Sequence, residues 1–503
     1  MEHRANIAVI GGGFGGALMA MVARRLGHSV VLIEKGEHPR FAIGESSTPL
    51  ANLFLQQIAE DYNLPQLLPF RRWGEWQQKY PEIGCGLKRG FSFFHHEFGQ
   101  LYSDSSDHRR QLLVAASPRD EVADTHWFRR DFDQRLVSEA QSLGVDYFDQ
   151  TELIGFHENR DDTLLLGRRN DELINFRVGF VVDASGPGGC LFRLLRLSQR
   201  PLPLMPLTSG LFAHFSNVGP WPSEEGVPYP VENAAVHHVF DGGWVWVLKF
   251  NNGITSAGVA ATQEKVGLLR LNEGAAGWSR LLNQLPSLAV QFQGANVQDD
   301  FVFVPELSFG LEEIVGNRWA ILPPAAGFID PLLSTGFALT MKGIIRLAKL
   351  LPLPRESDLL AYQRETFNEL DQVSRLVGAL YSKMDDFEMF TALAQLYFVS
   401  VTFAETANRL GKIDLPHSIL LCDHFDFSES IREICDLAVN STSRELILKK
   451  ISKTIEPFNI SGLADPTKRN WYPVIIDDLF RFASKLDSTE PEIREMLLRE
   501  KML

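Results

Sequence analysis

Hydrophobic and polar residues along the first 35 positions follow two different periods. Residues 7–10 and 28–34 are short apolar, β-branched runs typical of buried strands, whereas residues 17–26 carry apolar side chains at helical spacing. A glycine-rich turn joins the first strand to the helix. This order of strand, turn, helix and strand predicts the start of a Rossmann-like α/β domain.

The middle of the chain changes to a pattern typical of an antiparallel sheet. Alternating or aromatic runs, each expected to form a strand, are 209–215, 235–240, 244–250 and 255–261. A buried strand and a long helix opening at Ser334 follow, and the remainder is mainly helical in pattern. The domains we expect are a Rossmann-like domain at 1–199 and 318–350, an inserted antiparallel-sheet substrate domain at 200–317, and a mainly helical region at 351–503.

Composition and charge narrow the choice of function. The 503 residues are 45% hydrophobic and 22% charged, enough apolar surface for two or three domains. The net charge of −14 disfavours binding to nucleic acid or anionic membranes. The cysteines form no CxxC pair, which argues against a metal site. The sequence shows neither a basic region followed by an apolar leader nor a long apolar run, which argues against export and membrane insertion. We therefore expect a soluble, cytoplasmic protein without a bound metal.

The glycine turn has the spacing of a dinucleotide-binding motif. Gly11, Gly13 and Gly16 form GxGxxG between the first strand and the helix. The first glycine permits the tight turn, the second lets backbone amides approach a pyrophosphate, and the third allows close helix–strand packing. Glu34 ends the second strand, where a carboxylate can accept hydrogen bonds from ribose hydroxyls. Together these residues predict a dinucleotide site.

Two further segments resemble FAD contacts of the p-hydroxybenzoate hydroxylase-like superfamily. Residues 127–133 have the form hxRxxFD around Arg129, and residues 182–186 end a buried strand in a small-residue turn. A helix start and a β-turn are the alternative readings of these segments. The resemblance implies that FAD is the cofactor, bound additionally through Arg129, Asp183, Gly186 and Asp330.

Three more segments resemble the flavin-dependent halogenases. Residues 243–248, GWVWVL, are similar to the family's GWxWxIP signature, with Lys249 in place of the proline. Lys88 follows the GESSTP loop, 44–49, as in the family, and residues 328–336 end in Ser-Thr-Gly. The resemblance covers residues 1–350. It implies that Trp244 and Trp246 lie near the flavin, and that Lys88 presents hypohalous acid to the substrate.

The resemblance also implies a halide site at Ser334, Thr335 and Gly336, where backbone amides at a helix start attract an anion. The structural alternatives are that the two tryptophans form one packed sheet face, that Lys88 is a surface charge, and that Ser334 or Thr335 simply caps the helix. If Lys88 lies among its apolar neighbours, desolvation lowers its pKa and yields a neutral amine or a directional donor.

The roles of three other polar residues stay open. Glu45 is a catalytic candidate near the flavin edge or beside Lys88, and alternatively only caps its loop. His95 and His96 are candidate substrate bases, although satisfied core histidines are the commoner case.

The sequence also departs from related families at two places. Residues 323–327, PPAAG, replace the Gly-Asp usual in flavin hydroxylases, and Leu333 stands where tryptophan halogenases have a glutamate. These departures favour a phenol- or pyrrole-type halogenase. It would use halide, oxygen and reduced FAD from a separate flavin reductase on an electron-rich aromatic, free or carrier-protein-bound. The alternatives are an FAD-dependent monooxygenase or reductase of the same fold, and a non-catalytic flavin-binding protein.

Overall fold

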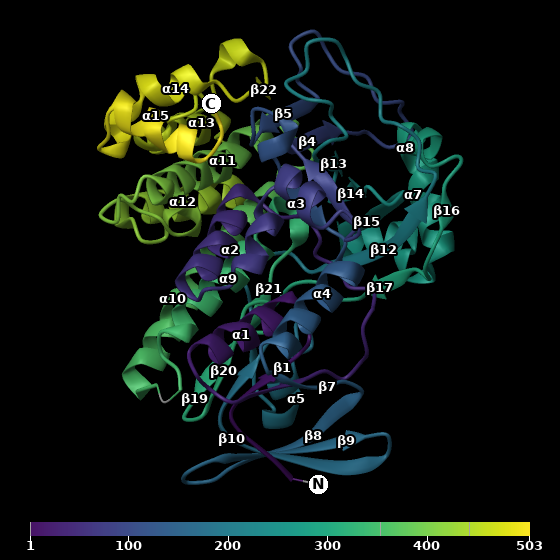
Figure 1. The fold of residues 1–503 in the computed structure, drawn as a ribbon. Helices are drawn as coiled ribbons and strands as arrows, with labels where there is room; N and C mark the ends of the chain where they lie inside the picture. Colours follow the sequence, from purple (N-terminus) through teal and green to yellow (C-terminus); the bar gives the residue numbers. More distant parts are fainter. Residues whose placement is uncertain (1, 353, 442) are drawn as a thin grey trace.

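The computed structural model describes residues 2–352, 354–441 and 443–503 (Figure 1). A Rossmann-like layer holds the N-terminus, a second large sheet lies above it, and the C-terminal helices pack beside both (Figure 1). This mixed architecture confirms the expected fold class.

The Rossmann-like sheet is built around β1. β1 pairs in parallel with β2 and β10, and Ile10 lies in register with Ile33 and Asp183. The carboxyl ends of the three strands therefore meet at one edge, where α/β folds bind ligands. The strands in spatial order are β19 (Val315–Gly316), β20 (Trp319–Ile321), β10 (Glu172–Asp183), β1 (Glu2–Ile10), β2 (Val30–Ile33) and β7 (Asp146–Phe148), with the hairpin β8 (Thr151–Glu158) and β9 (Thr163–Arg169) extending β10.

Helices cover this sheet and carry the segments that surround its ligand edge. α1 packs against both α4 and α9, and its buried face is rich in alanine and methionine, which permits close approach. The segment that begins at Trp127 becomes helical only from Arg129, because Trp127 ends a strand paired with Cys85. The helices of this part are α1 (Phe14–Arg25), α2 (Pro49–Asp61), α3 (Trp73–Lys79), α4 (Arg129–Ser142), α5 (Cys190–Leu195) and α9 (Gly336–Ala348).

The second sheet has the four antiparallel strands expected from the alternating pattern. It also recruits strands from outside residues 200–317: β4 pairs in parallel with β13, and β5 and β22 continue the sheet. In order the strands are β16 (Asn296–Val297), β12 (Thr208–Ser216), β15 (Ile254–Thr262), β14 (Gly243–Lys249), β13 (Ala235–Phe240), β4 (Gly90–His95), β5 (Gln111–Ala115) and β22 (Trp471–Tyr472), with β17 (Val302–Val304) on β12.

The two faces of the second sheet belong to different cores. The face with Trp244, Trp246 and Phe93 joins the core shared with the Rossmann-like part. The opposite face packs under α6 (Gln263–Leu269), α7 (Ala275–Gln284) and α8 (Pro286–Gln291), where Phe215 of the sheet contacts Trp278 of α7. Shorter strands complete the structure: β3 (Cys85–Lys88), β6 (Asp124–Trp127), β11 (Gln199–Arg200), β18 (Phe309–Leu311) and β21 (Gly327–Phe328).

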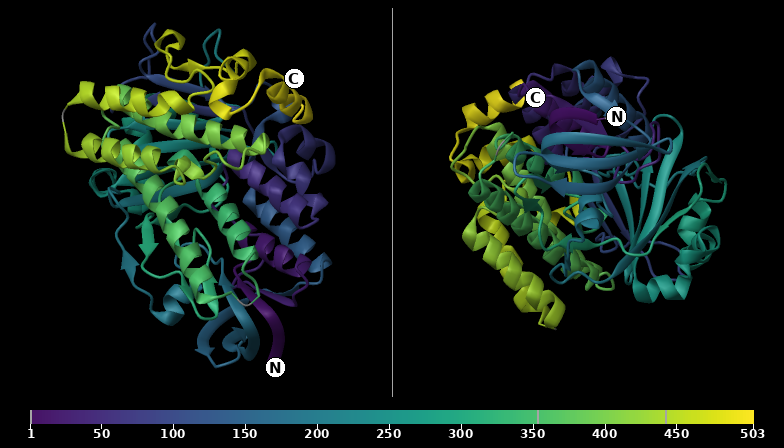
Figure 2. Two further views of the ribbon diagram at one scale, coloured as in Figure 1. Left: turned by 90° about the vertical axis from the view of Figure 1, so that its left-hand side faces the viewer. Right: turned by 90° about the horizontal axis from the view of Figure 1, so that it is seen from below.

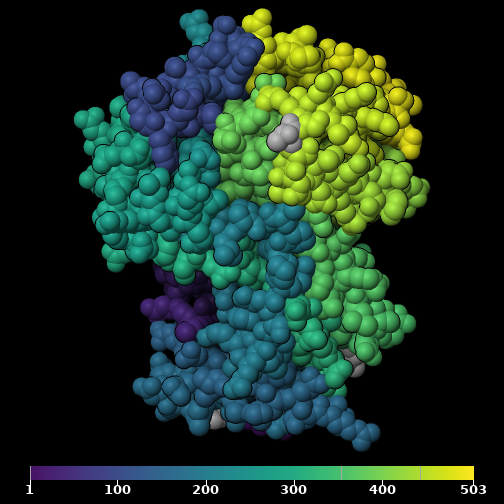
Figure 3. All heavy atoms as spheres, turned by 180° about the vertical axis from the view of Figure 1, so that it is seen from behind, coloured from purple at the N-terminus to yellow at the C-terminus, as the bar shows by residue number. Residues whose placement is uncertain are grey.

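The C-terminal region is mainly helical, as predicted, and packs closely on the rest. Its long helices run side by side in Figure 2, and from behind they form one continuous surface with the sheet region (Figure 3). Phe390 and Phe398 of α11 contact Phe93 of β4. The helices are α10 (Glu356–Tyr381), α11 (Phe387–Arg409), α12 (Phe425–Asn440), α13 (Arg444–Ile455), α14 (Ile476–Arg481) and α15 (Glu490–Arg499).

By length and composition alone, α11 is long and apolar enough to cross a membrane, with a mean hydropathy of 1.3 over 18 residues. However, 78% of that window is buried inside the fold, as expected for the core helix of a folded domain. Its apolar character therefore has a packing explanation.

Candidate active site

The glycine turn between β1 and α1 has the geometry that the motif predicts. Gly11 has φ +99°, a conformation that L side chains rarely adopt, and a Cβ on Gly16 would lie 1.8 Å from the Gly11 carbonyl oxygen. α1 begins at Phe14 after Gly13, with no side-chain cap. The N–H groups of its first turn are thus available to a phosphate.

Glu34 lies at the end of β2, directly beside this turn. Its carboxylate accepts hydrogen bonds from the amides of Gly12 (2.7 Å) and Gly36 (2.8 Å), and Arg40 lies 3.4 Å away. Burial acts to raise the pKa of Glu34, but the Arg40 charge and the two amides outweigh it and lower the pKa. Glu34 is therefore an ionised acceptor placed where a ribose would lie.

Arg129 and Asp183 both lie near the turn, and both are engaged with neighbouring protein groups. Arg129 makes a bidentate ion pair with Asp133 (2.7 Å for each bond) and donates to the carbonyls of Ile43 and Gly44. The Asp183 carboxylate accepts from the Ser185 hydroxyl and the Leu191 amide. Arg129 thus fixes the loop before α2, and Asp183 holds the turn before α5.

The surroundings of Gly186 are open. It has φ +77°, and a Cβ there would meet nothing within 4 Å. This small-residue turn therefore leaves space at the carboxyl edge of the sheet. The turn lies close to Gly11, because a Cβ added to Gly11 would contact the backbone of Ala184.

A cavity of about 100 Å³, hereafter the first cavity, lies between β14 and the start of α9. It joins segments far apart in sequence: the 43–46 loop, the Trp244 and Trp246 face of β14, and residues 323–337. Trp244, Trp246, Glu45, Asp330, Ser334, Thr335 and Gly336 all line it. The structure thus brings together most of the residues predicted for catalysis and for the halide.

The start of α9 has no side-chain cap. Ser334 adopts a left-handed conformation with φ +53°, and Thr335, the N-cap residue, makes no side-chain cap hydrogen bond. The alternative in which Ser334 or Thr335 caps the helix through its side chain therefore does not fit the structure. Gly336 opens α9 with nothing within 4 Å of a Cβ position, so its backbone faces open space in the cavity.

Asp330 connects the tryptophan strand to α10. Its carboxylate accepts from the Trp244 indole (3.2 Å), from the Leu332 amide (2.9 Å) and from the Tyr381 hydroxyl (2.8 Å). Burial raises the pKa of Asp330 to about 7, although these hydrogen bonds oppose the shift. Tyr381 was not predicted from the sequence, because no local pattern relates it to Asp330.

Trp246 lies beside Trp244, with ring centroids 5.6 Å apart, and donates to the Ser256 hydroxyl (3.3 Å). Both indoles are buried and their N–H groups are bonded to the protein. They therefore present rigid aromatic surface to the first cavity.

Lys88 is completely buried at the end of β3. Its Nζ donates to the Ser46 hydroxyl (2.8 Å) and the Ser47 carbonyl (2.5 Å), and lies 4.0 Å from the centre of the Phe91 ring. Burial lowers the pKa of Lys88 to about 7, and the charge of Asp124 opposes that shift. This buried environment does not fit the alternative in which Lys88 is a solvated charge at the surface.

Asp124 faces Lys88 on the neighbouring strand, and sequence reasoning missed it. The two residues are partners in the β3–β6 ladder, and the carboxylate accepts from the Asn52 amide (2.8 Å). Burial raises the pKa of Asp124 to about 7, while Lys88 opposes the shift. Among the described residues, the second carboxylate oxygen of Asp124 has no hydrogen-bond partner.

Glu45 and the two histidines have different environments. Glu45 is buried at the first cavity and bonds the His214 ring (3.0 Å), while its other oxygen is unpaired among the described residues. His95 bonds the Met384 carbonyl (3.1 Å) and His96 bonds His238 (3.0 Å). Burial lowers the pKa of both, to about 3 for His96. His95 and His96 are therefore bonded core histidines and line neither cavity described here.

A second cavity, of about 120 Å³, lies on the other side of Lys88. Ser46, bonded to Lys88, lines the first cavity, whereas Phe91, in contact with the same ammonium group, lines the second. α11 and the last 45 residues form most of its remaining wall. Lys88 thus lies between residues that line two different cavities.

Comparison with known proteins agrees with this geometry. Residues 6–254 match the family model of FAD dependent oxidoreductases. The chain is 27% identical to the monodechloroaminopyrrolnitrin halogenase PrnC of Pseudomonas fluorescens, over 80% of this chain and 73% of that protein. It is 24% identical to the tetracycline 7-halogenase of Kitasatospora aureofaciens, over 98% and 94% of the two chains.

The structure of the halogenase PltM superposes with a TM-score of 0.81 at 22% identity, covering 92% of this chain and 99% of that one. The protein is thus an FAD-dependent oxidoreductase by its fold, its glycine turn and its family match. Within that class, the chain resembles flavin-dependent halogenases along most of its length.

Proposed function

We propose that this enzyme halogenates an electron-rich aromatic molecule through Lys88, using a halide, oxygen and reduced FAD from a separate flavin reductase in the cytoplasm. The observation that carries the proposal is the position of Lys88. It is a buried lysine with one neighbour lining the first cavity and another lining the second.

The residues around the first cavity fit a bound flavin. The glycine turn and Gly186 leave room for the dinucleotide, with N–H donors at the turn and an acceptor at Glu34, and the first cavity continues from the 43–46 loop to the start of α9. Bound reduced FAD would supply the two electrons that, with oxygen and a halide, yield hypohalous acid. We assign Gly11, Gly13, Gly16, Glu34, Arg129, Asp183, Gly186 and Asp330 to this site.

The first turn of α9 is the proposed halide site. Its backbone N–H groups carry the partial positive charge of a helix start, and Gly336 opens onto the cavity. Because neither Ser334 nor Thr335 uses its side chain as a cap, we assign halide binding to the backbone.

Trp244 and Trp246 form the apolar wall opposite this turn. Their indole N–H groups are bonded elsewhere, so the wall excludes water from the oxidant. Glu45, buried on the same side, holds the loop beside Lys88 through its carbonyl bond to the Trp127 amide (2.6 Å).

Lys88 transfers the halogen to the substrate. As a neutral amine it takes halogen from hypohalous acid and releases water; the ring then accepts the halogen, loses a proton and restores the amine. As a protonated donor it instead hydrogen-bonds hypohalous acid, which reacts with the ring to give the halogenated ring and water. In either form the nearby Asp124 tunes the protonation of Lys88.

The aromatic substrate is proposed to occupy the second cavity. Several relatives are named for aromatic substrates, including a carrier-protein-bound pyrrole for two of them. Leu333 places no carboxylate before Ser334, so the substrate must be reactive without help from that position. This favours a phenol- or pyrrole-type ring, free or carrier-bound. In this proposal residues from 1–199 and 351–503 enclose the substrate, whereas 200–317, expected to form the substrate domain, lines the first cavity beside the 318–350 part of the flavin domain.

The first experiment needs no knowledge of the substrate. An anaerobic complex of the enzyme with reduced FAD is mixed with oxygenated buffer, with and without bromide, and the return of the oxidised flavin spectrum is followed. We expect bromide to accelerate this return. We expect Lys88→Ala to keep the bromide effect but to lose bromination of a phenol panel.

No bromide effect over a wide concentration range would instead indicate a monooxygenase or reductase of the same fold. No flavin turnover at all would point to a non-catalytic flavin-binding protein. A bromide effect together with normal bromination by Lys88→Ala would remove Lys88 from the mechanism.

A further inference from the structure

The second cavity has walls of two different kinds. One kind is apolar and comes from β5, α11 and the C-terminal segment, and includes Val114, Phe398, Leu463, Ile476, Leu497 and Met502. The other is a polar stripe along α11 at helical spacing: Thr402, Glu405 and Arg409. An apolar cavity with a few polar groups on one side orients its ligand by those groups.

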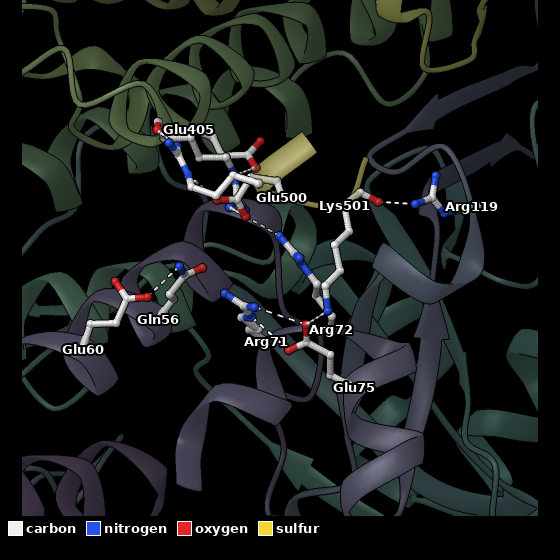
Figure 4. Close-up of polar contacts among 11 residues, drawn as sticks. Gln56, Glu60, Arg71, Arg72, Glu75, Arg119, Glu405, Glu500 and Lys501 are labelled. Atoms are coloured by element: carbon white, nitrogen blue, oxygen red, sulfur yellow. Dashed lines mark hydrogen bonds and ion pairs between the residues drawn. The ribbon is translucent and has the colours of Figure 1, made fainter. Parts of the chain in front are cut away.

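Arg409 is not free to bind an anion in this stripe. It donates to Glu405 Oε1 (2.7 Å) and to Glu500 Oε2 (2.8 Å). Glu500 also bonds Arg72, and Figure 4 shows Arg72 reaching Glu500 below α11. Two arginines therefore balance two carboxylates, and the network presents no uncompensated positive charge.

Of the two charged groups in this stripe, Glu405 is the one left with capacity to bind a ligand. Only its Oε1 is engaged, and within the described part of the chain no donor bonds Oε2. Its side chain is 14% exposed, and the residue lines the second cavity. An ionised carboxylate oxygen is an acceptor only, so it requires a ligand that brings an N–H or O–H group.

The position of Glu405 relates it to Lys88. The Glu405 charge is one of those that raise the pKa of Asp124, the ladder partner of Lys88. Phe91 lines the same cavity and contacts Lys88. A ligand held at Glu405 thus has its ring between α11 and the Phe91–Lys88 side.

We propose that Glu405 determines the substrate class, by accepting a hydrogen bond at Oε2 from the O–H or N–H of a neutral aromatic molecule in the second cavity. Phenols, arylamines and N–H heteroaromatics satisfy this requirement. Ethers of the same shape lack the donor, and aromatic carboxylates bring a like charge. The inference rests on the proposed function, because it places the halogen acceptor on the far side of Lys88.

Binding can be measured without turnover. Equilibrium dialysis of the enzyme with oxidised FAD, in the absence of halide, would compare 2-naphthol, 2-methoxynaphthalene and 2-naphthoate. We expect 2-naphthol to bind at least about tenfold more tightly than the other two, since a hydrogen bond to a charged acceptor is stronger than one to a neutral acceptor. If none of the three binds, or if 2-naphthoate binds best, the proposal fails.

The variant Glu405→Gln tests the residue itself. We expect the variant to bind 2-naphthol about tenfold more weakly and to bind 2-methoxynaphthalene with unchanged affinity. Glu388→Gln is the matched control, because Glu388 lies on the same helix but is 62% exposed and pairs with Arg444. An unchanged preference for 2-naphthol in Glu405→Gln would overturn the assignment.

The result is separable from the halogenation test. The bromide effect on flavin reoxidation requires no aromatic ligand, and the dialysis requires no halide. If bromide accelerates flavin reoxidation but the preference for 2-naphthol is the same in Glu405→Gln, only the Glu405 assignment fails. If the preference depends on Glu405 without any bromide effect, the cavity binds donor aromatics for another reaction.

Discussion

Lys88 and Asp124 are paired across the β3–β6 ladder, and both side chains are buried. Each charge opposes the effect of burial on the other, and each group has a pKa of about 7. Charges that also reach Asp124 come from Glu405 and Arg409 of α11. The protonation states of Lys88 and Asp124 therefore depend on each other.

Asp124→Asn is expected to shift the pH profile of halogenation to lower pH. The Asp124 charge raises the pKa of Lys88, so its removal lets burial lower that pKa further. The part of the rate–pH profile that is governed by the protonation of Lys88 moves to lower pH, whether the neutral or the protonated form of Lys88 is active. Bromination of a phenol between pH 5 and 9 measures the shift. A movement to higher pH, or none, would contradict the coupling.

Gly16→Ala is expected to abolish FAD retention or folding. Its Cβ would lie 1.8 Å from the Gly11 carbonyl oxygen, a backbone atom that cannot move away cheaply. Gly267→Ala is the matched control, because Gly267 lies in α6 with nothing within 4 Å. The control should keep its flavin and its melting temperature. Bound flavin absorbance and thermal unfolding provide the measurements, and full FAD content in Gly16→Ala would refute the expectation.

Ser334→Gly and Thr335→Ala are expected to retain the bromide effect on flavin reoxidation, because backbone amides hold the halide in the proposed site. Ser334 has φ +53°, so glycine there relieves strain and should stabilise the fold by up to about 1 kcal/mol. Flavin reoxidation rates at several bromide concentrations are the measurement. Loss of saturation by bromide in either variant would assign the halide to a side chain.

Asp330→Asn is expected to change how stability depends on pH. The folded pKa of Asp330 is raised from 3.8 to about 7, so the folded state binds the extra proton between those values. Stability contributed by this protonation is present below pH 4 and is lost as pH rises to 7, by at most about 1.4 kcal/mol per pH unit. Because asparagine does not titrate in this range, the variant should not show that decrease in stability. Urea unfolding at pH 5 and pH 7 compares the two proteins, and equal pH dependence would contradict the raised pKa.

Local interactions explain what was predictable from the sequence. The β1–α1–β2 unit follows from short-range sterics, since Gly11 and Gly16 permit a turn that side chains would block. The alternation in residues 208–262 predicts strands with one face in each of two cores. The placement of Trp244, Trp246 and the 334–336 segment at one cavity agrees with the motifs, while their chemical roles remain predictions.

Only the tertiary structure decided which distant residues meet. Asp124 lies 36 positions from Lys88, and it becomes a partner only because β3 and β6 pair. Tyr381 reaches Asp330 from α10, and α11 brings Glu405 to the second cavity. β4 and β5 join a sheet that the sequence pattern assigned to residues 200–317 alone. Such contacts depend on long-range packing of apolar faces, which the local periodicity of a chain does not encode pair by pair.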